Sequence, residues 1–340
     1  MKKLLLFFLL SFSTIFCTDE IVSPEVIDEE LTQAEKDFDI AKKMFNPWFG
    51  GPLLTGSGNV MPPGYFNFNP TFQATNNHAS FDSRRKSRSI DDNLNLNQNL
   101  QLGYGLFNRV DTTFTIEGNY NEQSHKEYVT FGDSSIKISF SLTKEYPYIP
   151  AMKISFKEVF PTGKYQNLDP SKIGLDSSGN GSFTSEFGFN ISKVFWFWPT
   201  HPMQSRLAFT YGFPSKVRVK NFNSYGGGYN TDGHVFPGKY FQGSFGYEFA
   251  FNQNIVFAID LTYQYRKESC FFGHLGTTES GSIASVGSNY QDSLSLAPAL
   301  EYNFTPDLSL VGGVWFSVYG KNTYDFIAGI ITFSYGAKIK

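Results

Sequence analysis

The sequence predicts an all-β protein: a transmembrane antiparallel β-barrel of about 12 strands, with short periplasmic turns and long extracellular loops. Its composition is the first indication, because aromatic residues make up 18% of the 340 residues and charged residues only 17%, against roughly 25% charged residues in soluble domains. Polar and apolar residues also alternate along most of the chain, and short connections alternate with long ones. A membrane barrel explains all three features, since lipid-facing apolar side chains alternate with polar side chains that face the lumen.

The same composition excludes several other classes of protein. No run of 18 or more apolar residues follows the N-terminal region, which excludes a helical membrane protein. Two cysteines cannot build a disulfide framework or a structural zinc site, and with five scattered histidines no metal or other cofactor is implied. Residues 18–44 hold nine acidic and three basic residues while the remainder is nearly neutral, so nucleic acid is not an expected partner.

The N-terminus has the features of an export signal. Lys2 and Lys3 precede an apolar stretch that is too short to span a bilayer, so residues 1–17 are interpreted as a signal peptide. A lipid anchor on Cys17 is the alternative, and either reading indicates an exported protein. If Cys17 is removed with the signal, Cys270 has no cysteine partner. The predicted location is the bacterial outer membrane.

Residues 18–62 are interpreted as a periplasmic N-terminal segment, followed by the barrel in residues 63–340. Apolar residues at three- to four-residue spacing predict a short acidic helix over residues 24–44. Residues 46–62 are rich in Gly and Pro. They form either a periplasmic linker or a segment folded into the lumen as a plug or gate. In the second case, four apolar side chains would line a path for apolar solutes: Trp48, Phe49, Leu53 and Leu54.

Strand periodicity is clearest in residues 93–106, where leucines and Tyr104 fall on one face and Asn, Gln and Gly on the other. A helix would scatter these residues around its surface. The same alternation predicts strands in the runs 66–74, 110–120, 136–142, 152–157, 183–192, 206–213, 241–251, 255–266 and 293–304. Residues 308–319 and 326–339 complete the twelve, although both of their faces carry apolar side chains. Ile330 and Ile331 interrupt the alternation, which suggests either a β-bulge or a stretch packed on both faces.

The predicted connections also alternate. Short ones are expected at residues 108–109, 144–149, 198–202, 252–254 and 305–307, and long ones at 76–92, 121–130, 161–181, 214–238 and 267–289. The short turn at residues 320–323 is the exception on the rim of long loops. Amphipathic rings favour the lipid headgroup level. The aromatic residues beside the short turns therefore indicate a girdle: Phe107, Tyr146, Tyr148, Phe195, Trp196, Trp198, Phe251 and Phe304.

Two motifs resemble a family of exported proteins. One is the Trp-Phe-Gly-Gly-Pro-Leu-Leu-Thr-Gly-Ser run from Trp48, with the Met-Pro-Pro-Gly-Tyr-Phe-Asn run from Met61. The other is Phe-Pro-Thr-Gly-Lys-Tyr from Phe160. Both resemble outer-membrane transporters of the phenol meta-degradation pathway protein type, which are distantly like hydrophobic-compound and fatty-acid channels. The resemblance covers roughly residues 45–340 and implies a transport role. Neither motif is an active-site signature.

Charged residues on the polar faces of the strands are the main candidate functional residues. In a narrow lumen such charges must pair or be hydrated. They therefore form either a salt-bridge network that closes the lumen or a polar path that selects solutes. Lys137 beside Glu117 and Arg206 beside Glu186 are expected neighbours. The lumen-facing candidates are Asp111, Glu117, Lys137, Lys153, Lys157, Glu186, Arg206, Glu248, Asp260, Arg266 and Glu301.

A basic cluster lies in the first predicted long loop, at Arg84, Arg85, Lys86 and Arg88. It is either a solvated loop or a contact for lipopolysaccharide phosphates or another anionic partner, because arginine pairs well with phosphate. The expected partners are outer-membrane lipid and lipopolysaccharide, a small-molecule solute and the barrel assembly machinery. The sequence does not set the oligomeric state.

No catalytic residue is predicted. All five histidines fall in expected loops or turns, and none has a serine in a strand phase that would place both on one face. The sequence therefore predicts a channel or transporter for small solutes, with hydrophobic solutes among the candidates. The alternative is a sealed barrel with a structural or surface-adhesion role.

Overall fold

The computed structural model describes residues 23–44, 48–198 and 201–339. The expected signal peptide, including Cys17, lies outside these residues, as does part of the turn expected at residues 198–202. The chain divides into two compact units, Met1–Asn46 and Pro47–Lys340. In the part that is described, no helix is both long and apolar enough to cross a membrane.

The first unit contains the helix α2 (Pro24–Met44), which confirms the helix expected from the spacing of apolar residues. Its first turn is closed by the Ser23 carbonyl, which accepts hydrogen bonds from the backbone N–H groups of Val26 and Ile27 at 3.0 and 3.2 Å. Val26, Ile27 and Leu31 are exposed to solvent within this unit.

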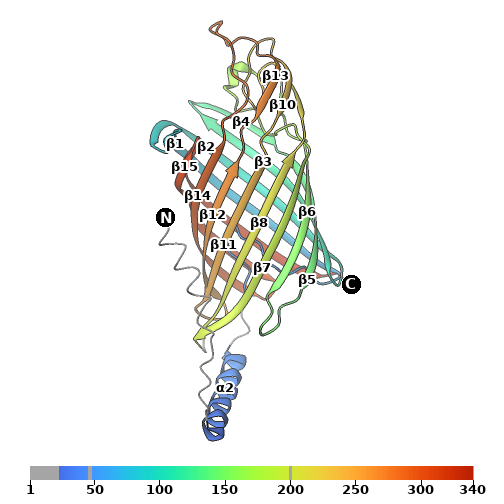
Figure 1. Cartoon of the computed structure of the whole chain (residues 1–340), viewed down its shortest axis with the longest axis vertical. Coiled ribbons are helices and arrows are strands. Elements are labelled where there is room, and N and C mark those ends of the chain that lie inside the picture. The colour runs from blue at the N-terminus through green and yellow to red at the C-terminus, as the bar shows by residue number, and fades with distance from the viewer. Residues whose placement is uncertain (1–22, 45–47, 199–200, 340) are drawn as a thin grey trace. The chain divides into compact units, whose positions relative to one another are not determined.

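The second unit is a closed antiparallel barrel of twelve strands, which confirms the predicted fold class (Figure 1). Pairing of β2 with β3 closes the sheet, and β4 and β5 pair in succession with β3 and so form one interrupted strand. The strands of the barrel are β1 (Tyr65–Phe81), β2 (Ser87–Phe107), β3 (Val110–Gln123), β4 (Lys126–Phe131), β5 (Ser134–Thr143), β6 (Ala151–Phe160), β7 (Thr184–Trp198), β8 (His201–Pro214), β11 (Tyr240–Ala250), β12 (Ile255–Arg266), β14 (Gln291–Thr305), β15 (Leu308–Lys321) and β16 (Thr323–Lys338).

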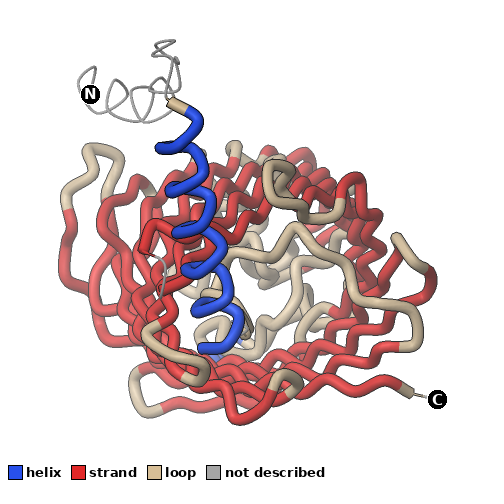
Figure 2. The backbone as a smooth tube through the Cα atoms, turned by 90° about the horizontal axis from the view of Figure 1, so that it is seen from below, coloured by secondary structure: helices blue, strands red, loops and turns tan. Residues whose placement is uncertain are grey.

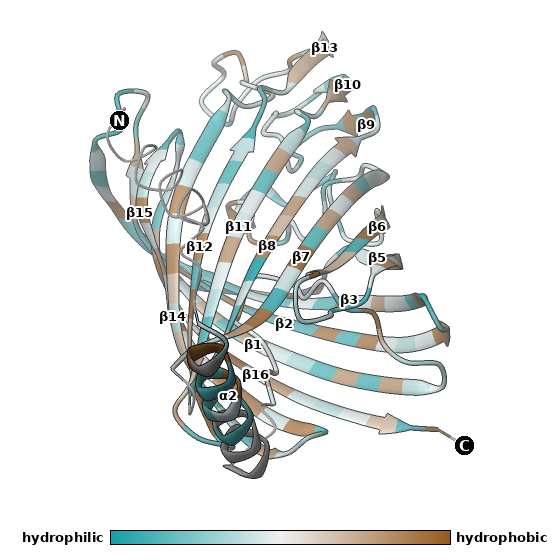
Figure 3. Cartoon of the chain, turned by 60° about the horizontal axis from the view of Figure 1, so that its bottom comes forward, coloured by the Kyte–Doolittle hydropathy of each residue, from teal (hydrophilic) through white to brown (hydrophobic). Residues whose placement is uncertain are grey.

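The two faces of the barrel wall differ in polarity, and the bands of colour along each strand in Figure 3 follow this alternation. Residues paired across antiparallel strands point to the same face. On β8, Ala208 pairs with Ser244, whereas the neighbouring Phe209 pairs with Gly243 and is exposed on the outer face. Among the described strands of the barrel, β4 pairs only with β3, and the others have a partner on each side. Such pairing is what a lipid environment requires.

The connections follow the predicted alternation, but two of the expected long loops are largely strand. β1 continues to Phe81 and β2 begins at Ser87, so the connection expected at residues 76–92 comprises only residues 82–86. The connection expected at residues 121–130 is a tight turn between β3 and β4, in which Ser124 and His125 have positive φ. These extensions were missed because their alternation is weak. Strands that rise above a bilayer meet water on both faces and need no apolar side.

The three other long connections carry structure of their own. Residues 161–183 contain the short 3₁₀ helix η1 (Pro170–Lys172). The next two connections contribute β9 (Val217–Lys220), β10 (Asp232–Phe236) and β13 (Cys270–His274), which pair into a separate sheet. We call this three-stranded sheet the cap sheet. It has its own apolar core of Val217, Val219 and Val235, which are at most 2% exposed.

The last strands resolve the ambiguity at Ile330 and Ile331. Register is unbroken there on both sides, so the suggested β-bulge at this position is wrong. Ile330 is buried and Ile331 is exposed, which shows that apolar side chains lie on both faces of β16. Register shifts occur instead between β14 and β15, one next to Leu294 and one next to Asn303.

Aromatic side chains are exposed on the outer side of the rim that carries the short turns. Phe107, Tyr146 and Tyr148 belong to this group, with Tyr148 98% exposed. Three more of the expected rings are exposed, namely Trp196, Phe251 and Phe304, and Phe195 is half-buried. The side chain of Trp198 is not among those that the structure describes. Rings exposed at this level suit the boundary between hydrocarbon and water.

Candidate functional site

The strand register places the eleven charged candidates on the inner face of the barrel. Asp111, for example, pairs with Ser139, Ser139 with Ser155, and Ser155 with Gly188. Five of the eleven are at most 5% exposed: Asp111, Arg206, Glu248, Asp260 and Glu301. The others on this face are Glu117, Lys137, Lys153, Lys157, Glu186 and Arg266.

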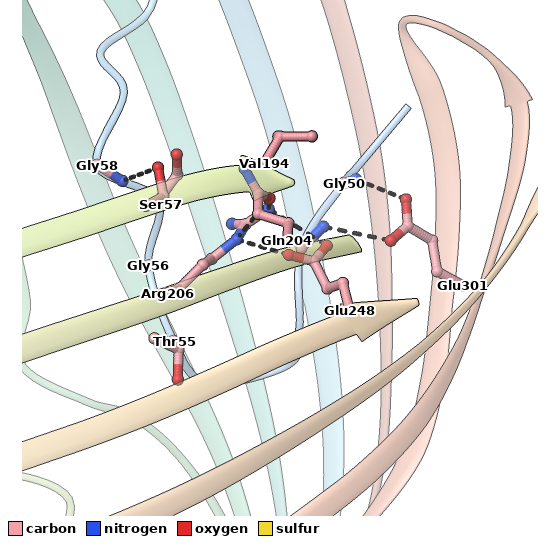
Figure 4. A network of polar contacts seen from close by, with 12 residues as sticks. Gly50, Thr55, Gly56, Ser57, Gly58, Val194, Gln204, Arg206, Glu248 and Glu301 are labelled. Carbon is pink, nitrogen blue, oxygen red and sulfur yellow. Dashed lines mark hydrogen bonds and ion pairs between the residues drawn. The ribbon is translucent and has the colours of Figure 1, made fainter. Parts of the chain in front are cut away.

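Residues 48–62 run inside the barrel, along its polar face, and we call them the lumen segment. Two carboxylates of the wall, those of Glu301 and Asp260, hold its first half, and Figure 4 shows the contact of Glu301 with Gly50. Glu301 accepts hydrogen bonds from the backbone N–H groups of Gly50 and Gly51 at 2.6 and 3.3 Å. Asp260 accepts three, from the N–H groups of Leu54 and Thr55 at 3.0 Å each and from the Thr55 hydroxyl at 2.5 Å. Each buried carboxylate thus satisfies backbone donors that no strand pairs.

The second half of the lumen segment is held by side chains on the opposite part of the wall. The Ser192 hydroxyl accepts from Gly58 N–H at 3.1 Å, and Asp111 accepts from Met61 N–H at 3.0 Å. Lys153 Nζ donates to the Asn59 carbonyl at 2.8 Å. Gly58 lies so close to the wall that an added Cβ would come within 2.3 Å of the Ala151 carbonyl oxygen. Only glycine permits this approach. Figure 2 shows loop segments enclosed by the ring of strands.

A buried ion pair lies beside the lumen segment. Arg206 Nε donates to Glu248 at 2.7 Å. The Nε and Nη2 atoms of Arg206 also both donate to the side-chain oxygen of Gln204. Gly51, which has a positive φ of 120°, lies against the guanidinium group. Since both ions are almost fully buried, removing either partner would leave an uncompensated charge.

The pairs differ from the two that the sequence suggested. Arg206 pairs with Glu248 rather than with Glu186. Glu186 pairs instead with Lys157 at 2.9 Å. Lys137 lies directly opposite Lys157 in the register and makes no ion pair with Glu117. The choice of partner depends on strand register, which the sequence alone did not provide.

The four apolar side chains of the lumen segment do not form one surface. Leu53 packs against a small buried cluster on the wall, formed by Ala258, Ala299 and Val311. Trp48 and Phe49 are half-buried, and the Trp48 carbonyl accepts from the side chain of Asn303 at 2.6 Å. Leu53 and Leu54 line a cavity in the lumen, described next.

The interior contains space that side chains do not fill. A cavity of about 570 Å³ lies between the lumen segment and the inner faces of β1–β3, β5, β6, β8, β15 and β16. Two polar cavities, of about 400 and 220 Å³, both have Lys157, Glu186, Tyr240 and Arg266 in their walls. The Tyr240 hydroxyl donates to Glu186 at 2.5 Å, and the Arg266 guanidinium lies over the Tyr240 ring, 4.8 Å from its centroid.

The basic cluster at the tip of the β1–β2 hairpin is already engaged in part. Arg85 forms a bidentate ion pair with Asp292 of β14, in which Nη2 donates to Oδ2 at 2.8 Å. The Arg85 guanidinium also lies over the Tyr319 ring. Arg88 pairs with Asp82 at 3.0 Å. The N–H groups of Arg84 and Lys86 also donate to Asp82. A phosphate contact by this cluster stays a prediction.

Several residues of this site were not anticipated from the sequence. Ser192, Gln204 and Asn303 all hold the lumen segment or its ion pair, and they are uncharged. The only signal for them was their position on the polar face of a strand. In the described residues, no group of three or more His, Cys, Asp and Glu side chains is placed to hold a metal ion.

Comparisons with known proteins found similarity among solved structures only. No protein-family model matches the sequence, and no curated protein sequence matches it. Among solved structures, the COG4313 outer membrane channel from Pseudomonas putida F1 is similar with a TM-score of 0.65 at 11% sequence identity, covering 83% of this chain and 98% of that one. The transport unit of the autotransporter AIDA-I from Escherichia coli has a TM-score of 0.41 at 12% identity, covering 89% and 97% of the two chains. The CymD monoaromatic hydrocarbon channel has a TM-score of 0.36 at 9% identity, covering 82% and 89%.

The first of these likenesses shows that the chain has the fold of a bacterial outer-membrane barrel. This agrees with the predicted outer-membrane location, with the apolar outer face and with the exposed aromatic rings at the short-turn rim.

Proposed function

We propose that the protein is a passive outer-membrane channel for small solutes, in which the lumen segment narrows the path. The observation that carries the proposal is the set of polar cavities inside the barrel. A barrel that served only as a scaffold could fill its lumen with packed side chains, as small eight-stranded barrels do. Here polar groups line open space on both the β5–β6 and β11–β14 parts of the wall.

The lumen segment supports a role in controlling that path. It lies against the wall through bonds to Glu301, Asp260, Ser192 and Asp111, and these bonds come from both sides of the lumen. Because the lumen segment is fixed at several points, it reduces the cross-section of the lumen. Hydrogen bonds to the wall hold it there, so it can detach from the wall. The neighbour from Pseudomonas putida is described as a channel, and this description supports the same general role for the present chain.

Liposome swelling with neutral solutes of increasing size tests the proposal. We expect the purified protein to admit small sugars and to exclude larger ones, because the lumen segment narrows the path and the cavity beside it has a volume of about 570 Å³. A variant without residues 48–62 should raise the size limit. If neither protein causes swelling with the smallest solute, the channel proposal is wrong.

A second candidate function is contact with other surfaces through the cap sheet. Its buried valine core makes the long connections a folded unit, and Phe272 is 67% exposed on it. A sealed barrel that presents this sheet would show no swelling in either protein. It would lose cell-surface binding when Phe272 and the neighbouring exposed Phe236 are both changed to Ser.

A further inference from the structure

Among the charged side chains that line the cavity of about 570 Å³ beside the lumen segment, cations outnumber anions. Four of the described residues that line it have acidic or basic side chains: Asp111, Lys137, Lys153 and Arg206. The charge of Arg206 is balanced by Glu248. The remaining carboxylate, Asp111, opposes two lysines, which leaves one positive charge in excess.

Lys137 is the lysine without a partner in this cavity, in whose wall the Oδ1 atoms of Asn69 and Asp111 also have no hydrogen-bond partner among the described residues. Its ammonium group makes no ion pair and no side-chain hydrogen bond with any described residue. Lys153 donates only to a neutral acceptor, the Asn59 carbonyl, at 2.8 Å. Lys157, opposite Lys137 across β5 and β6, is neutralised by Glu186 and does not line the cavity. An ammonium group without a partner inside a protein favours the arrival of an anion.

The walls of the cavity have two kinds of surface. The strands contribute amides and hydroxyls such as Asn67, Asn69 and Thr113, whereas the lumen segment contributes Leu53 and Val60. A ligand that satisfies both surfaces has an anionic end and a short apolar body. The volume falls within the roughly 300–1,000 Å³ of small-molecule pockets.

We infer that this cavity binds small organic carboxylates, with the carboxylate at Lys137 and Lys153 and the apolar body against the lumen segment. The inference rests on the proposed channel function, because it names the class of solute that the lumen would select. Binding itself, however, is measurable without any passage of solute.

Benzoate and benzamide form a matched pair of probes, since they share a ring and differ mainly in charge. We would measure binding of each to the intact, processed protein in detergent by calorimetry. Benzoate should bind at least about tenfold more tightly than benzamide, as expected for one charge-assisted contact in a partly buried site. Lys137→Gln should remove this preference and leave benzamide binding unchanged, and Lys137→Arg should restore most of it.

Lys157→Gln serves as the matched control, because it removes a lumen lysine that does not line this cavity. It should leave benzoate binding unchanged. Circular dichroism and the heat-dependent gel mobility of each variant would establish that the barrel is folded.

Four outcomes overturn the inference: no saturable benzoate binding, equal binding of the two probes, an effect of Lys157→Gln equal to that of Lys137→Gln, or displacement of benzoate by equimolar inorganic phosphate. The last outcome would indicate a general anion site without selection for the apolar body. Benzoate binding in a protein that causes no liposome swelling would instead leave the site intact and reject the channel proposal.

Discussion

The attachment of the lumen segment to the wall leads to a quantitative prediction for the double variant D260N/E301Q. Asp260 and Glu301 together accept five hydrogen bonds from the lumen segment, four of them from backbone N–H groups. An amide in place of a carboxylate removes the charge and turns one acceptor oxygen into a donor. At least one charge-assisted bond is then lost at each position, and such bonds contribute about 1.5–3 kcal/mol each.

The expected loss is therefore about 3 kcal/mol or more in the free energy of attachment. Since about 1.4 kcal/mol corresponds to a factor of ten, the detached population of the segment should rise about a hundredfold. Amide hydrogen exchange read by mass spectrometry in detergent reports this population directly. Peptides that cover residues 50–56 should exchange about a hundredfold faster, whereas the strands of the wall should keep their rates.

The double variant D232N/E268Q is the matched control, because it removes the same two charges from exposed connections. It should not change exchange in the lumen segment. The reasoning is refuted if D260N/E301Q leaves the exchange of residues 50–56 unchanged, or if the control accelerates it equally.

Four further predictions follow from single contacts. Arg206→Met leaves Glu248 buried without its partner, so urea unfolding should show a loss of about 3–5 kcal/mol, and an unchanged midpoint would contradict the buried pair. Lys153→Gln with Lys157→Gln should shift the reversal potential of the protein in planar bilayers towards cation selectivity, and identical potentials would remove both lysines from the path. Gly58→Val should detach the second half of the lumen segment, because its side chain meets the Ala151 carbonyl, and normal exchange protection at residues 57–61 would count against the contact. Hydrogen bonds from the Lys86 and Arg84 N–H groups and the nearby Arg88 lower the pKa of Asp82 in the folded protein. The Asp82 carboxylate therefore stabilises the β1–β2 turn fully above the unfolded pKa of 3.8, and the turn should loosen as the pH falls through the lower folded pKa. A protection factor of Arg84 N–H that decreases at acidic pH, with no such decrease in Asp82→Asn, would be the expected sign.

The strands of the barrel were predictable because their signal is local. A wall between hydrocarbon and water imposes a period of two on every strand, and residues 93–106 display it without reference to any other part of the chain. The same reasoning explains why two strands were predicted to be shorter than they are. Residues 76–81 and 121–123 extend β1 and β3, where polar side chains such as Asn76, Asn77 and Asn121 interrupt the apolar alternation that predicts a strand.

The ion pairs were not predictable, although the residues that form them were. Alternation placed Lys157, Glu186, Arg206 and Glu248 on the inner face, but a pair depends on how far each strand is shifted against its neighbour. A shift of a few residues exchanges one partner for another, as with Arg206, which meets Glu248 rather than Glu186. Ser192 and Asn303 were missed for a different reason, since an uncharged polar residue on the polar face carries no distinguishing signal.

The central claim is that one face of the wall contacts hydrocarbon and the other contacts water. Nitroxide labels on single cysteines along β8, in a Cys270→Ser background reconstituted in bilayers, test it most directly. Positions 207, 209 and 211 should be relaxed by oxygen, which concentrates in hydrocarbon, and positions 208 and 210 by a water-soluble nickel chelate. Accessibility without a period of two, or with the faces reversed, would contradict the account.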